Sequence, residues 1–139
     1  MGNPHDAGNS VLKGKRVLIC EDEGITIMLF ARALKAAGLA VIGKARTGQE
    51  AVKLGLELAP DLILMDLTLN DGVNGIEAAR RILEVHPKTL IIGISGVTVD
   101  TVIQQGLDAG MCGFIPKPID ASHLRQEIQG LLERLAPEE

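Results

Sequence analysis

Short apolar runs alternate with amphipathic helical patterns along this chain, and no other feature constrains its fold as strongly. Five runs lack the period-two alternation of a half-exposed strand, which is typical of strands buried on both faces of a sheet. Strands of this kind that alternate with helices predict an α/β domain with a parallel sheet. The runs cover residues 16–20, 40–45, 62–65, 90–94 and 114–116.

The segments between these runs carry recognisable helix starts. Thr47 and Glu50 have the spacing of a capping box, in which the two side chains bind each other's backbone N–H groups. Asn74 and Glu77 repeat that spacing at the next segment. Asp120 precedes the last amphipathic pattern of the chain. These positions predict where three of the helices begin.

Residues 98–109 form the weakest of the predicted helices. The segment contains several β-branched side chains, and Gly106 lies inside it. Both features lower helix propensity, because β-branched residues lose side-chain freedom and glycine loses backbone freedom. We therefore expect this helix to be the least rigid one.

Five strand-helix units joined by right-handed crossovers define the expected topology. At 139 residues the chain suits one domain. The predicted fold is flavodoxin-like, a doubly wound five-stranded parallel sheet of order 2-1-3-4-5 with helices on both faces. We expect residues 14–136 to form this domain, 1–13 a flexible N-terminal tail and 137–139 a C-terminal tail. Any effector module is expected on another chain.

Composition excludes several classes of function. A net charge of -4 and only two aromatic residues argue against direct binding of nucleic acid, which needs a basic surface or a stacking platform. The apolar runs are too short to span a membrane, and the N-terminus has no apolar signal region. Cytoplasmic localisation is therefore expected. The two cysteines, Cys20 and Cys112, are expected to be buried, reduced thiols.

Ionisable or hydroxyl side chains follow four of the five strands. The carboxyl ends of parallel strands meet at one edge of a sheet, so these side chains should converge near the switch in strand order. Carboxylates that lie a few ångströms apart repel each other, and a hard divalent cation relieves this repulsion. The residues are Glu21 and Asp22 after the first strand, Asp66 after the third, Ser95 after the fourth and Lys117 after the fifth.

The chemistry of this set points to phosphoryl transfer. Magnesium binds few carboxylates and completes its coordination with water and phosphate oxygens. Lys117 supplies a positive charge and Ser95 a hydrogen-bond donor, and both suit phosphoryl oxygens. Asp66 would then be the nucleophile that accepts the phosphoryl group.

These motifs together resemble the receiver domain of two-component response regulators, of the stand-alone, single-domain type. The resemblance extends from about residue 15 to residue 135. Its parts are Glu21-Asp22 after RVLIC, Asp66 after LILM, Ser95-Gly96 after LIIGI, and the sequence FIPKP at 114–118.

The resemblance implies a role for each acidic residue. Asp66 is similar in position to the phosphoacceptor of the family. Magnesium, or manganese, would be bound by Asp22, Asp66 and the backbone carbonyl of Thr68, with Glu21 helping through a water molecule. The domain would catalyse only its own phosphorylation and dephosphorylation, so it is not expected to be an enzyme in the usual sense.

The resemblance also implies a conformational switch. Ser95 would donate a hydrogen bond to the phosphoryl group and Lys117 would pair with it, while the Lys117–Pro118 peptide bond is expected to be cis. Phe114 would move into the space behind Ser95 and reshape the surface of the fourth helix, fifth strand and last helix. On spacing alone, an ordinary core phenylalanine fits Phe114 equally well.

Function and partners follow from the same resemblance. The protein would act in a phosphorelay, in which a histidine kinase or a histidine phosphotransfer protein donates the phosphoryl group to Asp66. The reshaped surface would bind a downstream protein that the sequence does not identify. A phosphorylation-dependent homodimer through that surface is an open alternative, and neither nucleic acid nor a membrane is an expected direct partner.

Two features depart from the family pattern: the loop over the metal, and Val97, which stands two residues after Ser95 where a polar group is common. Asn70 stands where a proline is frequent, and Gly75 lies nine residues after Asp66 instead of eight. Thr68 and Val97 flank the expected position of the hydrolytic water. Neither side chain has an amide or carboxylate to orient that water, which predicts slow hydrolysis.

Two other functions compete with the receiver on this sequence. A haloacid-dehalogenase-like phosphatase also uses an aspartate after an apolar strand with magnesium, but it needs a second aspartate where Thr68 stands. A flavodoxin-like cofactor-binding module needs phosphate-binding loops and aromatic side chains, and acids stand there instead. Modification confined to Asp66 by acetyl phosphate or beryllofluoride would select the receiver.

Overall fold

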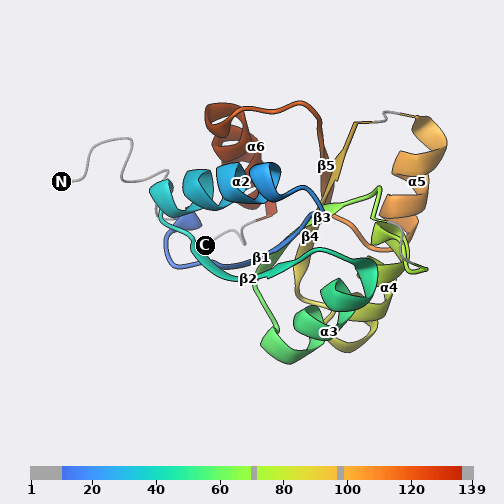
Figure 1. The fold of residues 1–139 in the computed structure, drawn as a ribbon. Helices are drawn as coiled ribbons and strands as arrows, with labels where there is room; N and C mark the ends of the chain where they lie inside the picture. Colours follow the sequence, from blue (N-terminus) through green and yellow to red (C-terminus); the bar gives the residue numbers. More distant parts are fainter. Residues whose placement is uncertain (1–10, 70–71, 97–98, 136–139) are drawn as a thin grey trace.

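The computed structural model describes residues 11–69, 72–96 and 99–135. Five parallel strands form one sheet in the order β2-β1-β3-β4-β5, which confirms the predicted topology (Figure 1). The strands are β1 (Arg16–Cys20), β2 (Ala40–Ala45), β3 (Leu62–Asp66), β4 (Leu90–Ser95) and β5 (Gly113–Pro116). The helices are α2 (Gly24–Ala36), α3 (Gly48–Leu58), α4 (Gly75–Val85), α5 (Asp100–Asp108) and α6 (Ala121–Leu135).

Helices cover both faces of the sheet and create two separate apolar cores. Figure 1 shows α2 and α6 side by side on one face, while α3 and α4 pack together on the other. Successive residues of a strand point to opposite faces. In β1, Val17 and Ile19 belong to the core under α2 and α6, whereas Leu18 and Cys20 belong to the core under α3 and α4.

The predicted helix starts are confirmed. The Glu50 N–H donates to Thr47 Oγ1 at 3.0 Å, and the Glu77 N–H donates to Asn74 Oδ1 at 2.8 Å. Asp120 Oδ1 accepts a hydrogen bond from the N–H of His123 at 2.9 Å, in the first turn of α6. Each bond satisfies a backbone donor that has no partner within its own helix.

The expected N-terminal tail, residues 1–13, extends too far into the folded part of the chain. Leu12 has no exposed surface and belongs to the core under α2 and α6, and the Lys15 N–H donates to the Leu12 carbonyl at 3.1 Å. An apolar side chain that the core buries holds the backbone around it, so the folded part already includes Val11. Residues 1–10 and the expected C-terminal tail, 137–139, lie outside the described residues.

Smaller differences concern strand ends and thiols. β3 and β4 each run one residue further than expected, to Asp66 and Ser95, so these two functional candidates are the last residues of their strands. Cys20 is buried as expected, but Cys112 is only half-buried, and both thiols are free. None of the helices in the described part of the chain has the length and apolar character of a bilayer-crossing segment.

Candidate functional site

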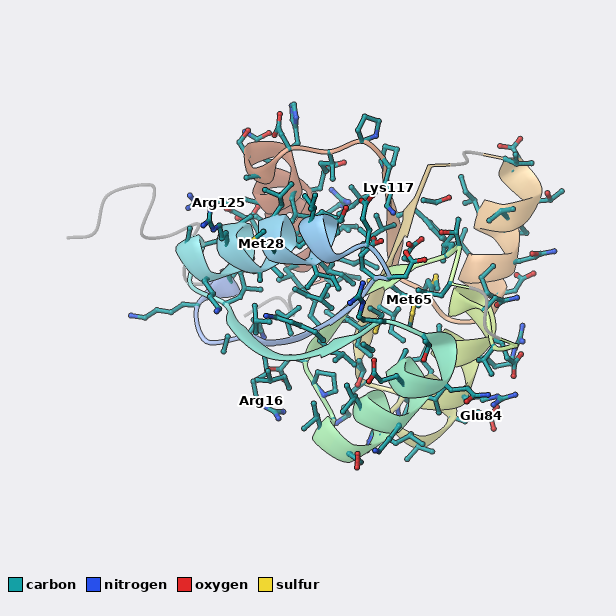
Figure 2. All side chains as sticks on the ribbon, in the orientation of Figure 1. Arg16, Met28, Met65, Glu84, Lys117 and Arg125 are labelled. Carbon is teal, nitrogen blue, oxygen red and sulfur yellow. The ribbon has the colours of Figure 1, made fainter. Side chains whose placement is uncertain are left out.

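Three carboxylates gather where β1 and β3 end. The two strands pair in parallel, with Cys20 opposite Met65, so the residues that follow each strand meet at the same edge of the sheet. One carboxylate oxygen from each of Glu21, Asp22 and Asp66 lies within 4.8 Å of the others. Figure 2 labels Met65, which lies next to this edge, and Lys117, which directly follows β5. The acidic cluster that the sequence predicted is therefore present.

Asp66 is held in one orientation. Its side chain is 1% exposed. Oδ1 accepts two hydrogen bonds from Thr68, one from the backbone N–H at 2.9 Å and one from the hydroxyl at 2.8 Å. Oδ2 lies 3.3 Å from the Nζ atom of Lys117. One oxygen is thus fixed by Thr68, and the other faces a cation.

Lys117 bridges two of the three acids. Its Nζ atom lies 3.0 Å from Glu21 Oε1 and 3.3 Å from Asp66 Oδ2. Desolvation alone would lower the pKa of Lys117, but its pairing with Glu21 and the negative charges of Asp66 and Glu21 raise the pKa above the usual lysine value. The lysine is therefore a firmly cationic group beside the aspartate.

Glu21 is the acid with the least favourable surroundings. It is 1% exposed, and its Oε2 accepts a hydrogen bond from the Glu23 N–H at 3.1 Å. Oε1 is buried and contacts Lys117 as an ion pair, but no described residue donates a directed hydrogen bond to it. Burial raises the pKa of Glu21, Lys117 opposes this, and the charge of Asp66 raises the pKa further.

A hard divalent cation fits this donor set. A buried carboxylate oxygen without a hydrogen bond costs free energy, and clustered negative charges repel each other. Magnesium takes oxygen ligands of this kind and neutralises such charges. The three acids are therefore able to hold a metal.

Ser95 and Lys117 are held next to each other by the sheet. Ser95, which is 6% exposed, pairs with Pro116 across β4 and β5, and its carbonyl accepts the Lys117 N–H at 2.8 Å. The Lys117–Pro118 peptide bond is cis. The ends of β4 and β5 thus bring a hydroxyl and an ammonium group to the edge where the acids lie.

Phe114 packs beneath α5 in space that two glycines leave. A Cβ atom added to Gly93 would lie 2.7 Å from the Phe114 ring, and one added to Gly106 would lie 2.4 Å from it. The ring is half-buried and joins the core under α3 and α4. Gly106, a poor residue for a helix, is therefore explained by a close contact with Phe114.

Sequence reasoning missed a residue beside this site. Arg46 received no role from the sequence, yet its Nη2 group donates to the backbone carbonyl of Asp22 at 2.8 Å. The end of β2 lies at the same sheet edge as the other strand ends, which was the available signal. Val97 and Asn70, to which the sequence analysis gave roles, lie outside the described residues.

A buried, oriented aspartate thus lies beside two acids and a lysine at the carboxyl edge of a doubly wound sheet, and the three acids could hold a metal ion. A family model described as "Response regulator receiver domain" matches residues 17–129. The chain belongs to this family, the receiver domains of two-component signalling.

Relatives of this chain include a regulator of similar length and a longer one. It is 36% identical over 111 residues to the chemotaxis protein CheY of Thermotoga maritima, and the match covers 80% of this chain and 92% of CheY. It is 32% identical over 115 residues to the response regulator GacA of Pseudomonas viridiflava, over 82% of this chain and 53% of GacA. The chain therefore spans most of CheY but about half of GacA.

Solved structures of receivers share the fold. A LuxR-family two-component response regulator from an Aurantimonas species superposes with a TM-score of 0.80 at 29% identity, covering 88% of this chain and 87% of that one. The response regulator domain of Thermotoga maritima CheB superposes with a TM-score of 0.76 at 28% identity, covering 88% and 96%. These findings give no support to the phosphatase or the flavodoxin-like cofactor-binding module.

Proposed function

We propose that this protein accepts a phosphoryl group on Asp66 in a magnesium-dependent or manganese-dependent reaction. The observation that carries the proposal is the setting of Asp66, whose Oδ1 is fixed by Thr68 while Oδ2 faces Lys117 at 3.3 Å. A carboxylate that is buried, oriented and paired with a cation is prepared for attack on an electrophile.

Each residue of the site has a part in the proposed reaction. Asp22, Asp66 and the Thr68 carbonyl would hold the cation directly and Glu21 through water, and the bound cation would supply positive charge to the phosphoryl oxygens. Asp66 Oδ2 attacks the phosphorus atom, a P–O bond forms, and the P–N bond to the donor histidine breaks. The histidine ring leaves with the electron pair of that bond. Lys117 then turns from the carboxylates to the transferred group.

The transferred phosphoryl group would bias a switch. Ser95 stands at the end of the neighbouring strand and donates its hydroxyl to the phosphoryl oxygens, and Phe114 moves into the space that Ser95 vacates. The surface of α5, β5 and α6 then changes shape for a downstream protein or for a second copy of the chain. Phosphodonor proteins of the histidine kinase or histidine phosphotransfer type suit this chemistry.

We also propose that the acyl phosphate is long-lived and that the domain catalyses no reaction besides its own phosphorylation and dephosphorylation. Thr68 uses its hydroxyl and N–H to bind Asp66, so its side chain is not available to orient a water molecule. The other residue that the sequence places beside this water is Val97. The half-life of the phosphorylated wild type is expected to exceed that of Val97→Glu.

The proposal is tested with acetyl phosphate as donor and mass spectrometry of the intact chain. Wild type should gain one phosphoryl group when Mg²⁺ is present and none when Mg²⁺ is chelated. Asp66→Asn should gain none, whereas the control Asp100→Asn, an exposed aspartate in the first turn of α5, should behave as wild type. Modification of Asp66→Asn at the wild-type rate would refute the assignment.

A further inference from the structure

The turn between β2 and α3, which consists of Arg46, Thr47 and Gly48, contacts both loops that carry the proposed metal ligands. One contact reaches the loop after β1, which holds Glu21 and Asp22. The other reaches the segment between β3 and α4. None of the functional roles assigned above includes this turn.

The contact to the first loop is a hydrogen bond from Arg46. Its Nη2 group donates to the Asp22 carbonyl at 2.8 Å, across 24 residues of sequence. Arg46 itself is anchored, because its backbone N–H donates to Glu50 Oε1 at 2.7 Å and the Glu50 N–H donates to Thr47 Oγ1 at the start of α3. The backbone that carries the Asp22 carboxylate is therefore fastened to the start of a helix.

The contact to the second loop is a backbone approach at Gly48. Gly48 is buried, and a Cβ atom added there would lie 1.7 Å from the carbonyl oxygen of Val73, so no side chain fits. Val73 is itself only 6% exposed. Two residues later, a Cβ atom on Gly75 would lie 2.4 Å from the carbonyl oxygen of Asp66. The start of α3 thus contacts the segment between β3 and α4 at Val73, and Gly75 of the same segment contacts the backbone of Asp66.

We propose that this turn is a third loop of the site and that Arg46 and Gly48 are positioning residues for the metal ligands. Arg46 holds the backbone of Asp22, and Gly48 sets the distance between α3 and the loop that follows Thr68. The proposal rests on the proposed function, since it concerns the same cation. It adds residues that hold the metal ligands in position to those that would contact the cation directly.

The positive charge of Arg46 and its hydrogen bond to Asp22 are expected to have opposite effects on cation binding, so a measurement of Mg²⁺ affinity can tell them apart. A guanidinium group close to the acids repels Mg²⁺, so removing its charge alone would tighten Mg²⁺ binding. Removing its hydrogen bond to Asp22 frees a ligand-bearing backbone and would weaken Mg²⁺ binding. The direction of the change in dissociation constant therefore separates the two roles.

The direction of this change is measured by isothermal titration calorimetry of Mg²⁺ binding to Arg46→Met. This variant keeps the apolar stem of the side chain. We expect the dissociation constant to rise by about tenfold, the lower end of the loss seen for outer partners of metal ligands. Arg46→Lys keeps a donor and should recover part of the affinity. The control Arg32→Met removes an exposed arginine from α2 and should leave the dissociation constant unchanged.

Gly48→Ala tests the second contact. The added methyl group would force Val73 away from α3, and we expect the Mg²⁺ dissociation constant to rise by about tenfold. Gly130→Ala is the matched control, because a Cβ atom there makes only an ordinary 3.5 Å contact with Arg134. If Gly48→Ala does not fold, as judged by urea denaturation, the Arg46 variants still test the proposal.

Two results separate failure of this proposal from failure of the proposed function. If wild type binds Mg²⁺ and is phosphorylated on Asp66 while Arg46→Met binds Mg²⁺ equally or more tightly, the turn has no positioning role and the proposed function stands. If wild type neither binds Mg²⁺ nor is phosphorylated, the proposed function is wrong and this proposal fails with it.

Discussion

Asp66 illustrates how a position at a strand end determines the surroundings of a single residue. The residue before it faces the core under α3 and α4, while its own carboxylate is held by Thr68 and faces Lys117. Replacing Asp66 by asparagine keeps its size and removes one of three crowded charges. The substitution therefore separates the electrostatic contribution of Asp66 from its shape.

The thiol of Cys20 offers a second test at this scale. Burial, and to a lesser extent the charge of Glu50, raise the pKa of Cys20 far above the usual thiol range. An unfolded cysteine loses its proton above about pH 8.5, whereas the native one keeps it. The native state then binds more protons than the unfolded state, so its free energy of unfolding falls as the pH rises.

The expected size of this effect is about 1.4 kcal/mol per pH unit for one thiol. Urea denaturation of wild type and Cys20→Ala between about pH 9 and about pH 10 measures it, because only the wild type has this contribution to the slope. Equal slopes in the two proteins would show that Cys20 ionises in the native state.

At the scale of elements, α5 and β5 meet through Phe114 and two glycines. Gly106→Ala places a methyl group where the ring now lies, and overpacking of this kind costs about 1–3 kcal/mol. Phe114→Leu removes part of the ring and should relieve the overpacking. We therefore expect the double variant Gly106→Ala/Phe114→Leu to be more stable than the sum of the two single changes predicts.

A double-mutant cycle from urea denaturation measures this coupling. The same cycle with Gly130→Ala in place of Gly106→Ala is the control, since Gly130 lies in α6 and its nearest side-chain contact is with Arg134. Additive effects of Gly106→Ala and Phe114→Leu would contradict the packing described for α5.

Elements also show where sequence reasoning succeeded. The strands and helix starts depend on local patterns, such as apolar runs and the spacing from Thr47 to Glu50, and these were predicted. The strand order followed from the fold class that the alternating pattern indicates. The contacts of Arg46 with Asp22 and of Gly48 with Val73 depend on how distant segments pack, which no local pattern records. Leu12 was assigned to a tail because residues 1–13 are largely polar and rich in glycine and asparagine, although its apolar side chain is buried in the core.

At the scale of the whole molecule, the acidic cluster links cation binding to global stability. Any cation that binds the folded state alone stabilises it by mass action, by about 2.7 kcal/mol when its concentration is a hundred times the dissociation constant. Thermal unfolding with and without Mg²⁺ should show a higher melting temperature with the cation.

Asp66→Asn should alter both parts of this measurement. Without Mg²⁺ the variant should melt at a higher temperature than wild type, because one of three neighbouring negative charges is gone. With Mg²⁺ its gain in melting temperature should be smaller, because one ligand is weaker. If neither quantity changes, Glu21, Asp22 and Asp66 do not form a shared cation site. Asp100→Asn again serves as the control.

The room that Gly93 and Gly106 leave for Phe114 has a mechanical consequence. If the ring swings away toward Ser95, it leaves a void between β4 and α5, and a void without water costs the dispersion contacts of every atom that lines it. The helix can recover those contacts only by collapsing toward the sheet. Movement of the Phe114 ring would thus shift the whole of α5 toward the sheet. A partner protein would then recognise the new position of α5.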